Sequence, residues 1–217
     1  MVEPPIPEDV TGKELDKEVR RDLGALAADN ATAVARHLVM VARLLDEDPG
    51  LALEHARAAQ RRAGRVGAVR EAAGLAAYRA GEYDEALREL RTARRLTGSQ
   101  EHLPVMADCE RGLGRPERAL EAAASPSAAQ LDRAGQIELA IVVAGARGDL
   151  GQHDAAVLEL QLPELAGRVA PDLREAQERL REAHEDALVA AGRRPARSDP
   201  AEGAAPEDDD VVLWEEG

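Results

Sequence analysis

The stretch Arg70–Gly98, REAAGLAAYRAGEYDEALRELRTARRLTG, decides the fold. Small and apolar residues recur in it at intervals of three and four, which is typical of amphipathic helices. The tripeptide Ala80-Gly81-Glu82 interrupts this pattern, and glycine is the usual residue where a helix ends and the backbone turns. The stretch therefore predicts two helices joined by a tight turn, at about residues 68–80 and 83–96.

The same layout recurs along most of the chain. The alanines that correspond to Ala86 are Ala52, Ala119 and Ala156, at intervals of 34, 33 and 37 residues. Repeats of this length indicate stacked helical pairs. A small residue where two helices meet lets their backbones approach closely, and a larger side chain would push them apart.

Twelve small or apolar positions are predicted to pack or turn these pairs. In chain order they are Ala52, Gly74, Gly81, Ala86, Leu90, Ala93, Ala107, Gly114, Ala119, Ala144, Gly151 and Ala156.

This pattern resembles the tetratricopeptide repeat, in which a small residue in the first helix is followed by a turn glycine and by Ala, a large apolar residue and Ala in the second. The copy at Arg70–Gly98 matches well. The first copy departs from the pattern at Met40 and Glu47, the last two copies end in Pro126 and Pro163, and the family's aromatic positions are absent. The resemblance implies an all-α, antiparallel helix-pair solenoid of about four hairpins with extra N- and C-terminal helices. An irregular α-helical bundle is the alternative.

A wider resemblance rests on three segments in order: PPIPEDVTGKELDKEVRRDL, RHLVMVARLLDEDP and PVMADCERGLGRPERALE. Together they are similar to an uncharacterised group of actinobacterial tetratricopeptide repeat proteins. This similarity covers about residues 4–191 and brings no activity with it.

The chain divides into three parts by composition. Residues 1–11 are predicted to be an extended leader, because three prolines among them forbid a helix. Residues 12–191 form the predicted array, with an N-terminal helix at about 12–28 and a final helix from Pro171 that closes the stack. Residues 192–217 are predicted to be a disordered acidic tail. This tail contains an apolar island, Val211, Val212, Leu213 and Trp214, between aspartates and glutamates.

Charge and cysteine content exclude several classes of function. The net charge is −14, which argues against nucleic acid and anionic membrane as partners, because both need a concentrated positive face. Cys109 is the only cysteine and has acidic neighbours, which disfavour a reactive thiolate. The N-terminus lacks the features of a secretory signal, so we expect a cytoplasmic protein.

The search for catalytic motifs is negative. The chain has no phosphate-binding glycine loop, no HExxH and no paired-cysteine metal spacing, and its five histidines share no helical face. We therefore expect no catalytic residue, no metal and no cofactor. A small-molecule or tRNA-linked enzyme ranks third among the possible functions.

The concave groove of the predicted array is the candidate binding site. In tetratricopeptide proteins the first helix of each pair lines this groove. The resemblance then implies a mixed apolar and charged lining that suits an extended peptide. The groove positions are His37, Val41, Leu44, Glu71, Leu75, Tyr78, Asp108, Arg111, Glu138 and Ile141. The family's carboxylate clamp for chaperone C-termini is not reproduced, and the bland interpretation is that these are ordinary core and surface residues.

Two functions of different classes follow. The first is a non-enzymatic protein- or peptide-binding scaffold that uses the groove. The alternative is a self-associating structural protein whose tail mediates assembly or autoinhibition. In the tail hypothesis, Trp214 docks into an apolar site and its acidic neighbours lie near Arg111, Arg115, Arg118 and Arg147.

Overall fold

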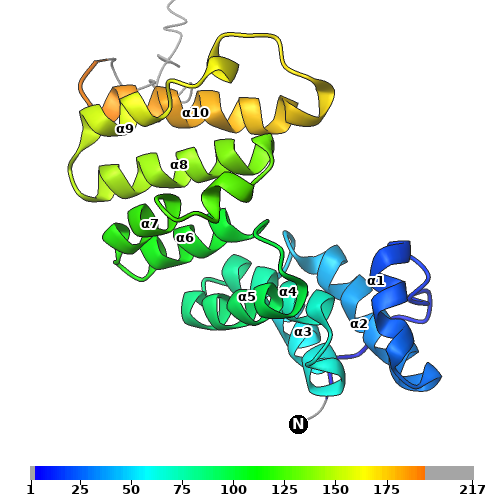
Figure 1. The fold of residues 1–217 in the computed structure, drawn as a ribbon. Helices are drawn as coiled ribbons and strands as arrows, with labels where there is room; N and C mark the ends of the chain where they lie inside the picture. Colours follow the sequence, from blue (N-terminus) through cyan, green and yellow to red (C-terminus); the bar gives the residue numbers. More distant parts are fainter. Residues whose placement is uncertain (1–2, 194–217) are drawn as a thin grey trace, which may run out of the picture.

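The computed structural model describes residues 3–193, and all regular structure in this range is helical (Figure 1). The α-helices in this range are α1 (Lys17–Asp22), α2 (Ala28–Leu44), α3 (Pro49–Ala63), α4 (Gly67–Arg79), α5 (Tyr83–Thr97), α6 (Leu103–Gly112), α7 (Pro116–Ala123), α8 (Arg133–Asp149), α9 (His153–Glu159) and α10 (Arg174–Ala190). Single 3-10 turns lie at η1 (Leu23–Ala25), η2 (Ala128–Gln130), η3 (Pro163–Leu165) and η4 (Pro171–Leu173).

Helices that follow each other in the chain pack against each other. The pairs are α2 with α3, α4 with α5, α6 with α7, and α8 with α9, and α10 packs alongside α8 and against α9 (Figure 1). The pairs follow one another through the molecule in chain order, from α1 and α2 at one end to α9 and α10 at the other. Because most packing is between neighbours in the chain, the core extends along the molecule from pair to pair.

The turns within three of the pairs share one backbone geometry. Gly81, Gly114 and Gly151 have φ angles of 75°, 71° and 72°, in the left-handed region that favours glycine. The residue after each glycine donates its backbone N–H to the carbonyl five positions earlier, over 2.8–2.9 Å. This is the hydrogen bond that closes a helix C-terminus in the Schellman arrangement.

The close contact between α4 and α5 depends on Gly74. A Cβ atom added at Gly74 would lie 2.6 Å from the Leu90 side chain and 3.2 Å from its backbone nitrogen. All nine of the predicted packing positions that lie within helices are buried, and Ala52, Ala86 and Ala119 are 0% exposed. The small side chains therefore allow the helices to approach, as the physical argument from the sequence requires.

We expect Gly74→Val to lower the free energy of unfolding by about 2 kcal/mol, because the added atoms overpack the contact with Leu90. Gly148→Val is the matched control, since no atom lies within 4 Å of a Cβ added there. The control should leave stability unchanged or raise it slightly, because glycine disfavours helices. Urea unfolding of both variants tests this, and equal effects at the two sites would contradict the packing argument.

The sequence interpretation of the N-terminal region is wrong in one respect. The predicted helix at 12–28 is only the short α1 and η1. Gly12 has φ 85°, which is not helical, and a Cβ added there would lie 2.8 Å from the side chain of Ala35 on α2. Thr11 donates its N–H and its hydroxyl to the carboxylate of Glu14, over 2.9 and 3.0 Å. The chain turns there without continuing into a helix. Asp48 caps α3, because its side chain accepts from the N–H of Leu51 over 3.0 Å.

The leader packs along the first helical pair. Val10 is 1% exposed, and its carbonyl accepts a hydrogen bond of 2.7 Å from Arg36. Glu3 accepts two hydrogen bonds from Arg62, of 2.8 and 2.9 Å. At the other end Arg193 forms an ion pair with Asp154, and the tail island Val211–Trp214 lies outside the described residues.

Candidate functional site

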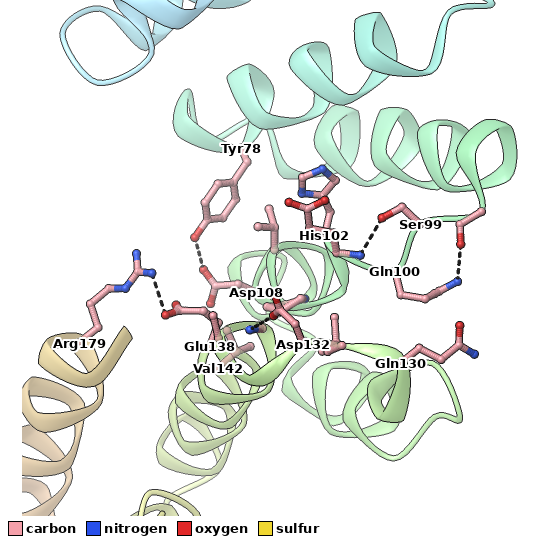
Figure 2. A pocket seen from close by; sticks show the side chains of 17 residues that line it. Tyr78, Ser99, Gln100, His102, Asp108, Gln130, Asp132, Glu138, Val142 and Arg179 are labelled. Atoms are coloured by element: carbon pink, nitrogen blue, oxygen red, sulfur yellow. Dashed lines mark hydrogen bonds and ion pairs between the residues drawn. The ribbon is translucent and has the colours of Figure 1, made fainter. Parts of the chain in front are cut away.

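A groove of about 720 Å³ runs between the α4–α6 region and the α8–α10 region (Figure 2). Its walls come from the C-terminal end of α4, the connection between α5 and α6, helix α6, the start of α8 and one side chain of α10. The lining residues are Tyr78, Gly98, Ser99, Gln100, Glu101, His102, Pro104, Val105, Asp108, Gln130, Leu131, Asp132, Ala134, Gly135, Glu138, Val142 and Arg179.

The charged groups of the groove are mainly carboxylates. Glu101, Asp108, Asp132 and Glu138 line it, whereas Arg179 is its only lysine or arginine side chain. Arg179 lies 2.8 Å from Glu138 and 3.6 Å from Glu175, so its charge is already shared by two acids. The groove is therefore negative overall and attracts cationic groups.

A hydrogen-bond network fixes the side of the groove formed by α4 and α6. The hydroxyl of Tyr78 donates to Asp108 over 2.6 Å, and Arg111 donates to the other oxygen of Asp108 over 2.8 Å. Arg111 also donates to Asp149 at the end of α8 over 2.8 Å. Burial and the neighbouring Asp108 raise the pKa of Tyr78, so it remains a neutral hydrogen-bond donor.

Besides Tyr78, two titratable groups at the groove have raised pKa values. Burial disfavours the charged form of His102, but the carboxylate of Glu71, 3.1 Å away, outweighs it and raises the pKa. Burial raises the pKa of Glu138, and Arg179 opposes this shift. Both effects depend on contacts between different helices, so they exist only in the folded chain.

Two buried oxygen atoms at the groove lack a hydrogen-bond donor among the described residues. These are Oε1 of Gln100 and Oε1 of Glu138. Glu138 Oε1 is close to Arg179, but the two groups are not aligned as a hydrogen bond. A ligand that brings N–H donors would satisfy these acceptors, which cost free energy when they are left unpaired.

The structure brings three of the sequence-predicted groove residues together, namely Tyr78, Asp108 and Glu138 (Figure 2). Glu71 is close to these residues, because it pairs with His102 of the groove. Arg111 lines an adjoining depression together with Asp149. The other predicted positions, Leu44, Leu75 and Ile141, are partly buried and do not line the groove.

Two predicted groove residues are corrected by their burial. Val41 is 4% exposed and belongs to the main core. His37 is 2% exposed, and its Nδ1 lies 3.0 Å from Nδ1 of His55 on α3. Neutral imidazoles satisfy this contact when one Nδ1 carries the proton and donates it to the other. Both side chains therefore join α2 to α3 and do not reach a ligand.

The His37–His55 pair makes stability depend on pH. Burial and the adjacent His37 lower the pKa of His55 from 6.5 to about 4. Between pH 6.5 and 4, His55 is protonated in the unfolded chain but stays neutral in the folded chain. We therefore expect the free energy of unfolding to fall as pH falls from 6.5 towards 4. Above that window the pair adds no pH dependence. In His55→Leu this part of the slope should disappear from urea unfolding curves. An unchanged slope in the variant would contradict the assignment.

The predicted cluster of positive charge is also corrected. Asp108 and Asp149 hold Arg111, Glu110 lies 3.5 Å from Arg115, and Glu159 lies 3.5 Å from Arg147. Of the four arginines, only Arg118 has no ion pair with a described residue. The local acids therefore cancel most of the charge that the sequence places near the third hairpin.

Several groove residues were missed by the sequence argument. Residues 98–102 lie in a connection, and Arg179 is on the final helix, far from the repeat pattern. The position of Asp132 could have been recognised from the sequence, because aspartate is a preferred residue just before a helix. It caps α8 by accepting a hydrogen bond from the N–H of Gly135 over 2.7 Å.

The groups that could supply covalent or metal chemistry are poorly placed for it. Cys109 is 0% exposed, and burial with its acidic neighbours raises its pKa to about 12, so the thiol stays protonated at neutral pH. Within residues 3–193 no three His, Cys, Asp or Glu side chains gather closely enough to hold a metal ion.

Among the described helices, none has the length and apolar character needed to span a bilayer. No protein-family model, curated protein or solved structure matches the chain.

Proposed function

We propose that this chain is a non-enzymatic binding protein that holds a basic, extended segment of a partner protein in the groove beside α4, α6 and α8. The observation that carries the proposal is the charge of the lining, in which four carboxylates and one arginine are found. That arginine already has two acidic partners, and Arg111, from the adjoining depression, pairs with Asp108, so the lining keeps an excess of negative charge. A partner rich in Lys or Arg would supply both the missing charge and the missing N–H donors.

The helix arrangement supports this assignment. Helices α4, α6 and α8 are the first helices of three successive pairs, which is the set that lines the concave face in a tetratricopeptide-like solenoid. We infer that the chain is such a solenoid. The resemblance to the actinobacterial repeat group fits this proposal and leaves the partner open. The single, unpaired Cys109 suits a reducing compartment such as the cytoplasm.

The groove has a size and polarity that fit a peptide segment. Its volume falls within the range of about 300–1,000 Å³ that is common for ligand sites. Its apolar side chains, including Pro104, Val105 and Val142, can contact the aliphatic stems of Lys or Arg, whose charged ends then reach the carboxylates. Electrostatic complementarity of this kind selects the partner and speeds association.

Self-association through a large apolar surface is less well supported. Among the described residues, the large hydrophobic side chains that are exposed are Leu96 on α5 and Leu158 on α9. They lie on different helical pairs, and isolated apolar residues of this kind are normal on a monomer. The groove therefore remains the better candidate for the functional surface.

A pair of defined peptides tests the proposal. We would titrate full-length protein into a fluorescein-labelled peptide of alternating Arg and Ala, and into its Glu-and-Ala counterpart, and follow the anisotropy. The basic peptide should bind and the acidic one should not, and added salt should weaken binding because it screens charge. The double variant Glu101→Gln/Glu138→Gln should lose most of this affinity.

The matched control is Glu54→Gln/Glu18→Gln, which removes two exposed carboxylates from α3 and α1, away from the groove. It has the same net charge as the groove variant. Equal loss of affinity in the two double variants would mean that only the overall charge matters, and the groove proposal would be rejected.

A further inference from the structure

A second depression, of about 510 Å³, lies between the second helices of two neighbouring pairs, α5 and α7. We call it the arginine groove. Its lining comes from α5, α6 and α7 and from the turn after α7. The lining residues are Leu87, Arg91, Arg94, Leu103, Met106, Glu110, Arg118, Glu121, Ala122, Ser125 and Ser127.

The arginine groove carries positive charge that the described residues do not neutralise. Arg118 has no ion pair with any of them, and Arg94 donates only to the neutral hydroxyl of Ser127, over 2.7 Å. Arg91 lies 2.7 Å from the buried Glu110, which Arg115 shares at 3.5 Å. Glu121 also lines the depression, so three arginines stand against two glutamates there. Arg94 and Arg118, which have no acidic partner among the described residues, are therefore the available anion-binding groups.

Helix α5 extends the positive surface beyond the depression. Arg88, Arg91 and Arg95 follow one another at i, i+3 and i+7, so they lie along one face of the helix. Arg88 and Arg91 pair with Glu89 and Glu110, so Arg95 is the member of this row without an acidic partner among the described residues. The floor of the depression is apolar, with Leu87, Leu103, Met106 and Ala122 contributing to it.

We propose that the arginine groove binds the chain's own acidic segment, residues 208–216, DDDVVLWEE, within the same molecule. The segment has the complementary chemistry: three aspartates precede Val211-Val212-Leu213-Trp214 and two glutamates follow. The carboxylates pair with Arg94 and Arg118, and Trp214 covers the apolar floor, where an arginine can stack on the indole ring. This contact is independent of the peptide-binding groove.

The length of chain beyond the described residues is sufficient for this contact. Arg193 is held at the start of α9 by Asp154, and fourteen residues separate it from Asp208. Fourteen extended residues span up to about 46 Å. The path from α9 and α10 passes α8 to reach α7, and packed helices are about 8–10 Å apart. The segment can therefore reach the arginine groove.

Charge also separates the two grooves. The groove beside α4, α6 and α8 is lined by carboxylates, so it repels residues 208–216, whereas the arginine groove attracts them. A tethered segment needs few strong contacts, because attachment to the same chain gives it an effective concentration in the millimolar range. The tail hypothesis from the sequence thus becomes specific, with α5 and α7 as the docking site in place of Arg111 and Arg147.

Trp214 is the only tryptophan, so its fluorescence reports on the segment directly. We would measure acrylamide quenching of Trp214 in the full chain and in a free peptide of residues 199–217. The full chain should show a blue-shifted emission and strong protection from quenching. Arg94→Glu/Arg118→Glu should lose this protection and match the free peptide.

The matched control is Arg20→Glu/Arg65→Glu, with the same change in net charge at exposed positions on α1 and before α4. It should keep the protection. A second test leaves the helices unchanged: replacing Asp208, Asp209 and Asp210 with Asn, and Glu215 and Glu216 with Gln, should abolish the protection as well. Far-UV circular dichroism verifies that each variant is folded.

Three results would overturn the proposal. The first is that Trp214 of the unmodified chain is quenched as freely as in the peptide, and the second is that the arginine groove variant and its control behave alike. Protection that rises with protein concentration would show that the segment binds a second copy, and the contact would not be intramolecular.

Discussion

Replacing Leu90 with alanine is expected to lower the free energy of unfolding by about 3 kcal/mol. Leu90 is 1% exposed and fills the contact between α5 and Gly74 of α4, within the largest core cluster. The substitution removes buried methyl groups and leaves a cavity that the helix backbones cannot close without moving. The core consists mainly of alanine and leucine. Because alanine buries little area, each buried leucine contributes a large share of the apolar area of the core.

Leu158→Ala is the matched control, because Leu158 is 62% exposed on α9. We expect this control to change stability by less than about 0.5 kcal/mol. Urea unfolding followed by circular dichroism measures both variants. Similar midpoints for Leu90→Ala and the unmodified chain would show that the α4–α5 contact is not the tight packing described here.

The second large effect is expected at Arg70. Its guanidinium donates to the carboxylate of Glu89 over 2.5 Å and to the carbonyl of Gly64 over 2.6 Å. Glu89 is 3% exposed, and Gln60 donates to the same oxygen over 2.6 Å. We expect Arg70→Met to lower the free energy of unfolding by about 3 kcal/mol, because it removes the more buried of the two guanidinium partners of this carboxylate. The other, Arg88, lies 3.3 Å from the second oxygen of Glu89 and is largely exposed.

A double variant separates the lost ion pair from lost packing. Arg70→Met/Glu89→Leu removes both charges, and it should recover much of the stability that the single variant loses, since a buried ion pair is itself worth little. The comparison uses urea unfolding of the two single variants and the double variant. If the effects simply add, Arg70 acts through packing and not through Glu89.

The sequence predicts the helices best where the signal is local. Asp48 before Pro49 marks the start of α3, and the three turn glycines end α4, α6 and α8 with left-handed backbone. Helix caps and turns depend on a few adjacent residues, so one sequence is enough to recognise them. Gly12 is a position where local sequence is not enough. It lies against Ala35 on another helix, and this tertiary contact cannot be read from the residues around it.

The candidate site could be predicted only in part. Tyr78, Asp108 and Glu138 were found because they occupy related positions on successive first helices. Residues 98–102 and Arg179 were not, since their place at the groove is set by packing between segments far apart in the chain.

Burial was equally hard to predict. His37 was assigned to the groove, yet it pairs with His55 inside the first helical pair, eighteen residues further along the chain. Gly112 at the end of α6 is a similar case, because a Cβ added there would lie 2.4 Å from the Tyr83 ring. The reason is the same for both residues: periodicity gives the face of a helix but not what the neighbouring helix places against it.

Hydrogen–deuterium exchange of the full chain, with and without the Arg-and-Ala peptide, tests the central claim most directly. If the peptide binds in the groove beside α4, α6 and α8, residues 98–108 and 131–142 should exchange more slowly when the basic peptide is bound. Helices α2 and α3 should not change. Protection of α2 and α3, or of no region during saturable binding, would contradict the assignment of the groove as the binding site.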